Sequence, residues 1–454
     1  MAAAPSTCLD EVSAGEGHVE LLTSPFEDTF GCGRDSCSFP SAVDRLQNTM
    51  SPLDLSLDFS KVGFIGRWLD SHAVGGKCEV VFPDIRTITS LTMGISLSIS
   101  FGVLFSILLY YLVVPGEKLS KRKVVSGSFL LTVTGFIPYI LFDLLTVKNT
   151  AVRFTICTPF VLYGFKILEA IFGFVPVGAK SSLQMYCQYF SFPSEILFDS
   201  DTSKPILASK KDVLDSAKHV MFCVLRVCLL CSCLSHHNYK PFGDTNAGEF
   251  FDGIGVGKHF NARHLGNCFT IALFFQQALA LGDAVMGNTV QIITGYKVLK
   301  SMRNPMLAAK SPSDFWGRRW NIIVHSVMKR GVYKAVRKYS SPILASLLVF
   351  IASGLFHEWL VHAMLIYGRS VSSGSVFLGS NTAFFIWNFV VIMVERLLVR
   401  MKVVKSIGKT LPRPLSTLVI IMSSLPVAHW FGNPYLNGGF FQDYEQCIII
   451  IRKR

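Results

Sequence analysis

Long apolar stretches constrain this chain most, because several exceed the roughly 20 residues that a helix needs to cross a bilayer. Half of the residues are hydrophobic and only 16% are charged, which a soluble core does not explain. The predicted fold class is therefore all-α, a polytopic integral membrane protein with about eight transmembrane helices. The predicted spans are 89–114, 124–147, 153–177, 217–234, 264–295, 341–367, 376–399 and 412–431.

The span at 264–295 is the least regular, because Gln276, Gln277 and Asp283 interrupt it. It is predicted as one tilted helix, two broken helices or the lining of a polar cavity. The connections 115–123 and 296–340, together with 400–411, are basic, and the positive-inside rule assigns them to the cytosol. Eight spans then place both ends of the chain on the lumenal side, whereas a split at 264–295 moves the N-terminus to the cytosol.

The first 60 residues differ in charge from the rest of the chain. They carry ten Asp or Glu and two Lys or Arg, whereas residues 61–454 carry 41 basic and 20 acidic residues. Their Ser, Gly and Pro content and sparse apolar residues predict a disordered, solvated tail, and they do not resemble a cleavable signal peptide. We therefore divide the chain into an acidic N-terminal tail, 1–85, and a multi-span membrane domain, 86–454.

A strongly basic segment precedes the sixth span. Between Lys297 and Lys338 there are eleven Lys or Arg residues and one acid. When these residues are placed on a helix at about 100° per residue, the apolar and the basic side chains fall on opposite faces. This pattern predicts an amphipathic helix at the cytosolic interface. The apolar face comprises Trp316, Trp320, Ile323 and Val327. Its basic side can attract anionic lipid headgroups, bind a soluble polyanion such as the phosphates of coenzyme A, or do both. Nucleic-acid binding is not predicted, since membrane spans enclose the segment.

His357 is an ionisable residue inside a predicted span, where polar groups are costly. It lies 16 residues after Ser341, or about 24 Å along a helix, and so near the bilayer midplane. A neutral imidazole there can remove a proton from a hydroxyl group that attacks a thioester. We predict that His357 is a general base. The alternative is a packed histidine that is hydrogen-bonded to a neighbour.

No metal site is predicted. Cys228, Cys231 and Cys233 would face different sides of a helix, and no histidine follows at the spacing of zinc ligands. His362 lies about 140° around the helix from His357, whereas zinc ligands on one helix are four residues apart. We also expect no tightly bound cofactor.

Two motifs carry a resemblance to a known family. Asn304-Pro305 is followed by Ser311-Pro-Ser-Asp-Phe-Trp-Gly-Arg-Arg-Trp-Asn321, and Ser353-Gly-Leu-Phe-His-Glu358 comes later. Together they resemble the membrane-bound O-acyltransferases, most closely the wax synthase branch, over residues 265–431. The resemblance implies a helical bundle around a chamber, which an acyl thioester enters from the cytosol and a lipid acceptor from the bilayer.

By this resemblance His357 is catalytic and Asn321 is its companion. An asparagine amide can donate a hydrogen bond to the oxyanion of the transition state, although Asn321 can instead satisfy a backbone group beside a helix. The predicted substrate-binding residues belong to the same motif as Asn321: they are Phe315, Trp316, Arg318, Arg319 and Trp320.

The expected reaction is transfer of an acyl group from acyl-CoA, the co-substrate, to a lipid alcohol. A long-chain fatty alcohol, giving a wax ester, is the first choice, and a sterol, diacylglycerol or secondary-metabolite hydroxyl is the alternative. A function of another class is a proton-coupled multipass transporter, which moves a substrate across sealed vesicles and forms no ester. The resemblance also implies the endoplasmic reticulum and membrane-lipid partners, and a homo-oligomer stays open because some relatives form one.

Overall fold

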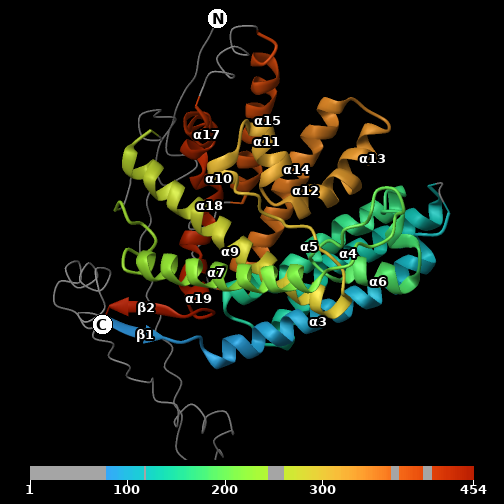
Figure 1. Cartoon of the computed structure of the whole chain (residues 1–454), viewed down its shortest axis with the longest axis horizontal. Coiled ribbons are helices and arrows are strands. Elements are labelled where there is room, and N and C mark those ends of the chain that lie inside the picture. The colour runs from blue at the N-terminus through green and yellow to red at the C-terminus, as the bar shows by residue number, and fades with distance from the viewer. Residues whose placement is uncertain (1–77, 117–118, 244–259, 370–377, 402–411, 454) are drawn as a thin grey trace, which may run out of the picture. The chain divides into compact units, whose positions relative to one another are not determined.

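The computed structural model describes residues 78–116, 119–243, 260–369, 378–401 and 412–453, all within the unit Asp54–Arg454. The described part is almost entirely helical (Figure 1). Of the predicted tail, residues 78–85 lie in this part: they include the short strand β1 (Cys78–Val81) and the first residue of helix α3. The remainder of the tail lies outside the described residues.

Seven described helices are long and apolar enough to cross a membrane, which confirms the predicted polytopic all-α class. They are α3 (Ile85–Leu112), α4 (Lys121–Leu144), α5 (Thr150–Phe172), α7 (Lys210–Ser235), α9 (Ala262–Thr294), α14 (Pro342–Val361) with its π-helical extension η5 (His362–Ile366), and α15 (Ser380–Leu398). The 33-residue helix α9 is continuous, so the alternative of two broken helices at 264–295 is wrong.

The eighth span is bent rather than straight. Pro414–Val427 and His429–Asn437 meet at an angle of 55°, so the span predicted at 412–431 corresponds to a bent pair of helical segments that extends to Asn437. The first part contains α17 (Arg413–Met422) and the 3₁₀ turn η6 (Leu425–Val427), and the second part is α18 (His429–Asn437). Pro426 lies within the turn at this break, where its missing backbone N–H interrupts the helical hydrogen-bond pattern.

Polar residues set the starts of several spans. The side chain of Asn149 accepts hydrogen bonds from Ala151 N and Val152 N at the start of α5. Ser209 and Asp212 form a capping box at the start of α7, and Ser341 caps α14 immediately before Pro342. These side chains satisfy amide groups that have no partner within the helix, which is why the spans begin where they do.

The connections sort into two groups by their mutual contacts. At one end of the bundle β1 pairs antiparallel with β2 (Ile450–Lys453), and Asn149 donates to the carbonyl of Asp443 at 2.9 Å. At the other end, the connection between α5 and α7 contacts the basic connection 296–340: Ile196 pairs with Val298, and Leu207 pairs with Tyr296. This alternation agrees with eight crossings, and it places β1 and β2 at the end away from the basic connections.

Helices α14 and α15 approach each other closely. A methyl group added at Gly354 would lie 2.6 Å from the Cα atom of Thr382, so only glycine permits this approach. About one turn along, Glu358 Oε1 accepts a hydrogen bond of 2.9 Å from the backbone N–H of Thr382. Glu358 therefore joins α14 to α15 beside its sequence neighbour His357.

The predicted interfacial helix in the basic segment is wrong. The chain instead forms short pieces: α11 (Pro312–Asp314), the π-helical turn η3 (Phe315–Arg319), α12 (Ile322–Met328), the π-helical turn η4 (Lys329–Tyr333) and α13 (Lys334–Arg337). The break comes at Trp320, which is extended, and Asn321, whose φ of +41° lies in the left-handed region. Arg330, predicted on the basic outer face, points inward and pairs at 2.8 Å with both Glu169 and Glu195.

Candidate active site

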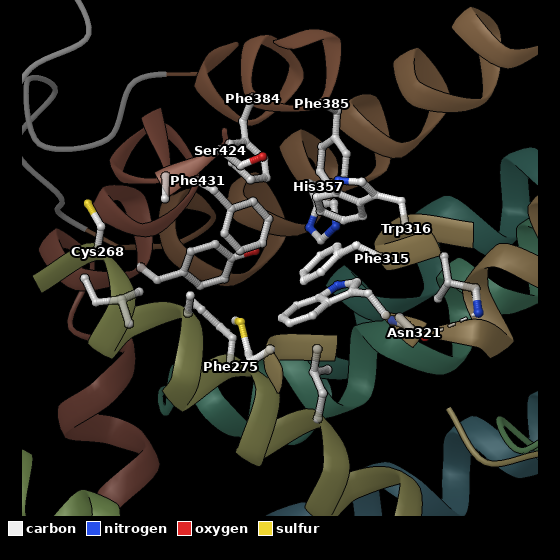
Figure 2. Close-up of a pocket in the computed structure, with 18 of the residues that line it drawn as sticks. Cys268, Phe275, Phe315, Trp316, Asn321, His357, Phe384, Phe385, Ser424 and Phe431 are labelled. Carbon is white, nitrogen blue, oxygen red and sulfur yellow. Dashed lines mark hydrogen bonds between the residues drawn. The ribbon is translucent and has the colours of Figure 1, made fainter. Parts of the chain in front are cut away.

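Two cavities of about 180 and 380 Å³ meet beside the motif residues. Figure 2 shows residues that line the smaller one. The smaller one, here called the apolar cavity, extends between α5, α9 and the bent span. The larger one, the basic-side cavity, extends toward α12, η4 and the end of α15. Seven residues line both: Trp316, Trp320, Asn321, Val324, Phe356, His357 and Phe385. The two predicted catalytic residues thus lie in the shared wall.

His357 is surrounded by aromatic rings. It stacks on Phe385 with ring centroids 5.0 Å apart and an interplanar angle of 15°, and the edge of Phe431 lies at a centroid distance of 5.0 Å. Its Nδ1 atom is buried and has no hydrogen-bond partner among the described residues. The alternative of a histidine held by Glu358 or a neighbouring carbonyl therefore finds no support at this nitrogen. The imidazole is oriented by ring packing.

Asn321 is held by the backbone beside it. Its Oδ1 atom accepts a hydrogen bond of 3.3 Å from Val324 N and thereby caps α12. The capping role that the sequence left open for Asn321 is therefore present. Because the carbonyl end of the amide makes this contact, the Nδ2 end remains a donor group in a residue that lines both cavities.

Three predicted substrate-binding aromatics form one wall. Phe315 stacks on Trp320 with centroids 5.5 Å apart, and Trp316 meets Trp320 edge-on at 6.2 Å. All three line the apolar cavity (Figure 2). Trp316 Nε1 donates a hydrogen bond of 3.0 Å to Asn388 Oδ1, and this bond fixes the indole between the motif and α15. Sequence reasoning missed Asn388, which has no local motif signal.

Arg318 and Arg319 do not line either cavity. Arg319 Nε is bound to Asp314 Oδ2 at 2.6 Å, and the Arg318 side chain, which is 79% exposed, lies 3.7 Å from the same carboxylate. Partial burial raises the pKa of Asp314, but Arg319, the amide of Lys310 and Arg318 outweigh it and hold that pKa below its usual value. The helix cap at this point is Ser311, whose Oγ accepts a hydrogen bond from Asp314 N.

Other cationic residues occupy the place expected for the arginines. Lys329 and Arg396 line the basic-side cavity, as does His325. Burial, together with the positive charge of Lys329, lowers the pKa of His325. Lys329 belongs to the basic segment but had no distinguishing signal there, and Arg396 was not among the predicted site residues. Its neighbour Glu395 accepts hydrogen bonds of 2.8 Å from Ser313 N and Oγ.

The apolar cavity offers few polar groups away from His357. Its walls come mainly from aliphatic and aromatic residues of α5, α9 and the bent span; examples are Phe154, Leu162, Ile271, Phe275, Leu279, Ile420, Leu425 and Phe431. Such a wall suits hydrocarbon. The arrangement therefore joins an apolar space and a basic space at a buried imidazole and an amide, which can remove a proton and stabilise an oxyanion.

Comparison with known proteins agrees with this geometry. Residues 299–387 match a family described as "Membrane bound O-acyl transferase family". The chain is 28% identical over 193 residues to "Probable long-chain-alcohol O-fatty-acyltransferase 2" of Arabidopsis thaliana. This match covers 40% of this chain and 52% of that protein. It is 32% identical over 99 residues to "Long-chain-alcohol O-fatty-acyltransferase" of Simmondsia chinensis, covering 20% and 27% of the two chains.

A sterol enzyme is also similar. The chain is 32% identical over 97 residues to "Acyl-CoA--sterol O-acyltransferase 1" of Arabidopsis thaliana, covering 20% of this chain and 27% of that protein. The matched regions thus span about half, or less, of the length of these relatives.

Proposed function

Because this chain belongs to the membrane-bound O-acyltransferase family, we propose that it transfers an acyl group from acyl-CoA to the hydroxyl of a lipid-soluble alcohol. A long-chain fatty alcohol, giving a wax ester, is the proposed acceptor. The observation that carries the proposal is the meeting of the apolar and basic-side cavities at His357 and Asn321.

The charges of the two cavities assign the substrates. Lys329 and Arg396 suit the phosphates of coenzyme A, so the donor enters through the basic-side cavity. The apolar cavity suits the hydrocarbon of the acyl chain or of the acceptor. The thioester carbonyl and the acceptor hydroxyl then meet in the shared wall.

The proposed chemistry is one direct transfer. A nitrogen of His357 takes the hydroxyl proton as the alcohol oxygen attacks the thioester carbon, and Asn321 Nδ2 donates a hydrogen bond to the resulting oxyanion. The carbon–sulfur bond then breaks, the thiolate of coenzyme A takes the proton from the imidazolium, and the ester remains. No covalent acyl-enzyme is required.

Sterol acylation is the second candidate, since one similar protein bears that name. The apolar cavity would have to admit fused rings in place of a flexible chain. An apolar pocket discriminates between substrates by only about 1–3 kcal/mol for each methylene group. A direct comparison of the two acceptors is therefore needed to choose between a fatty alcohol and a sterol. Residence in the endoplasmic reticulum is also part of the proposal, and it rests on the family resemblance.

The test is ester formation by membranes that contain this protein, supplied with labelled acyl-CoA and separately with fatty alcohol, sterol or diacylglycerol. We expect His357→Ala to reduce the rate by about 10²-fold or more. The matched control is His362→Gln on the adjoining turn, where His362 Nδ1 bonds to Tyr139 at 3.1 Å, outside both cavities. Full activity in a folded His357→Ala variant, or solute flux without any ester, would overturn the proposal.

A further inference from the structure

A second cluster of chemically reactive side chains lies at the far end of the apolar cavity. His264 and Cys268 are four residues apart on α9 and so share one helix face, and His429 is the first residue of α18. One ligand atom from each of the three lies within 4.8 Å of the other two. All three side chains are buried, at 2%, 5% and 3% exposure.

The distances fit the coordination of a metal ion. His264 Nε2 lies 3.5 Å from Cys268 Sγ. A tetrahedral zinc ion with ordinary bond lengths separates a sulfur from a nitrogen ligand by about 3.5 Å. A hydrogen bond between His264 and Cys268 would also give this distance. Such a bond would not by itself account for the third ligand group, His429, beside them.

The backbone supplies a further group. The carbonyl oxygen of Pro426 is 3.1 Å from His429 Nδ1 and 3.2 Å from His264 Nε2. A carbonyl only accepts, so a ring nitrogen that donates to Pro426 O carries the proton. With His429 Nδ1 as this donor, Nε2 of His429 and Nε2 of His264 are the nitrogens left to bind an ion. Ligating histidines usually donate their remaining N–H to a carbonyl or carboxylate in this way.

We propose that His264, Cys268 and His429 bind a transition-metal ion that prefers thiolate and imidazole ligands, Zn²⁺ or Cu⁺. Both ions suit a set of one sulfur and two nitrogens. The carbonyl of Pro426 completes the site as a fourth donor or as the partner of a ligating ring. This site is separate from His357, and its occupancy does not depend on the proposed acyl transfer.

The place of the site explains what the ion would do. Pro426 and His429 flank the bend of the eighth span, whereas His264 and Cys268 belong to the start of α9. The ion would therefore fix this bend against α9. Cys268 also lines the apolar cavity, so the fixed bend forms part of the cavity wall. The three residues are not recognisable as one site from the sequence, because His429 lies 161 positions after Cys268.

The chain offers a matched control. His219 and Cys223 on α7 form the same i, i+4 pair, with Sγ 3.7 Å from Nε2, but in the described part of the chain they do not belong to a group of three metal-ligand side chains. Cys268→Ser and His264→Ala remove ligands from the proposed site, and Cys223→Ser removes only the control thiol. Each variant is purified in detergent through an affinity tag that contains no histidine.

Elemental analysis measures the number of metal ions per chain. Co²⁺ is then added to metal-free protein, and its absorption spectrum shows whether a thiolate is among its ligands. We expect about one zinc or copper ion per chain in the wild type and in Cys223→Ser, and a loss of at least about fivefold in Cys268→Ser. Co²⁺ should give a thiolate charge-transfer band that Cys268→Ser lacks. Wild-type protein that contains no metal and gives no such band, or equal metal in folded Cys268→Ser, would overturn the proposal.

Discussion

The indole N–H of Trp316 donates a hydrogen bond of 3.0 Å to Oδ1 of Asn388, a side chain with no exposed surface. The same oxygen accepts from Ser424 Oγ at 2.6 Å, and Asn388 Nδ2 donates to Phe384 O at 2.8 Å. One amide on α15 thus joins the aromatic motif to the bent span. In an apolar bundle each of these partners would otherwise be an unsatisfied polar group.

Asn388→Leu should destabilise the protein more than Trp316→Phe. The leucine leaves both the indole N–H and the Ser424 hydroxyl without this acceptor, at about 1–3 kcal/mol for each buried group. Phenylalanine at 316 keeps a ring in place and leaves Asn388 its bond to Ser424. Thermal unfolding of both variants in one detergent measures the difference. An equal loss, or the reverse order, would show that the amide does not join these elements.

Asn321→Gly and Asn321→Ala should separate the two roles of Asn321. Glycine adopts the observed φ of +41° without strain and costs a helix cap only a few tenths of a kcal/mol, whereas alanine costs about 1–2 kcal/mol. If the amide stabilises the oxyanion, Asn321→Gly loses about 10²–10³ in kcat while its Tm stays near that of the wild type. A fully active Asn321→Gly variant would leave Asn321 as a cap alone.

Local signals in the sequence predicted much of this structure. The spans follow from apolar length, and their starts follow from capping residues such as Asn149 and Ser341. The motif pair identified His357, on α14, and Asn321, at the start of α12, and both residues line both cavities. The aromatic residues of the motif line the apolar cavity as well.

Long-range partners could not be predicted. Arg330 looked like one basic residue among eleven, but its charge is compensated by Glu169, which is 161 residues away. No period or motif reports such a pair. Arg319 was assigned to substrate because it belongs to the motif, although Asp314 of the same motif binds it. The bend beside Pro426 was not predicted for another reason: hydropathy measures apolar length and contains no information on the angle between helical segments.

Gly354→Ala should destabilise the protein by about 1–3 kcal/mol, because the added methyl would lie 2.6 Å from backbone that cannot move aside easily. Gly282→Ala on α9 is the matched control. A Cβ there meets nothing within 4 Å, and alanine favours a helix interior by about 0.5–1 kcal/mol over glycine. Tm should fall for the first variant and stay level or rise for the second. A stable Gly354→Ala protein would mean that α14 and α15 are not in close contact.

Arg330→Met should be severely destabilising and Arg318→Met should not. The Arg330 side chain is 14% exposed and lies 2.8 Å from both Glu169 and Glu195, so its loss leaves two buried carboxylates without compensation. Breaking a buried pair by removing one partner costs about 3–5 kcal/mol. Arg318 is 79% exposed and 3.7 Å from Asp314, and an exposed pair of this kind contributes about 0–1 kcal/mol. Tm and folded yield measure stability, and ester formation by Arg318→Met shows whether this arginine also acts on substrate. Equal stability of the two variants would mean that Arg330 does not compensate buried charge.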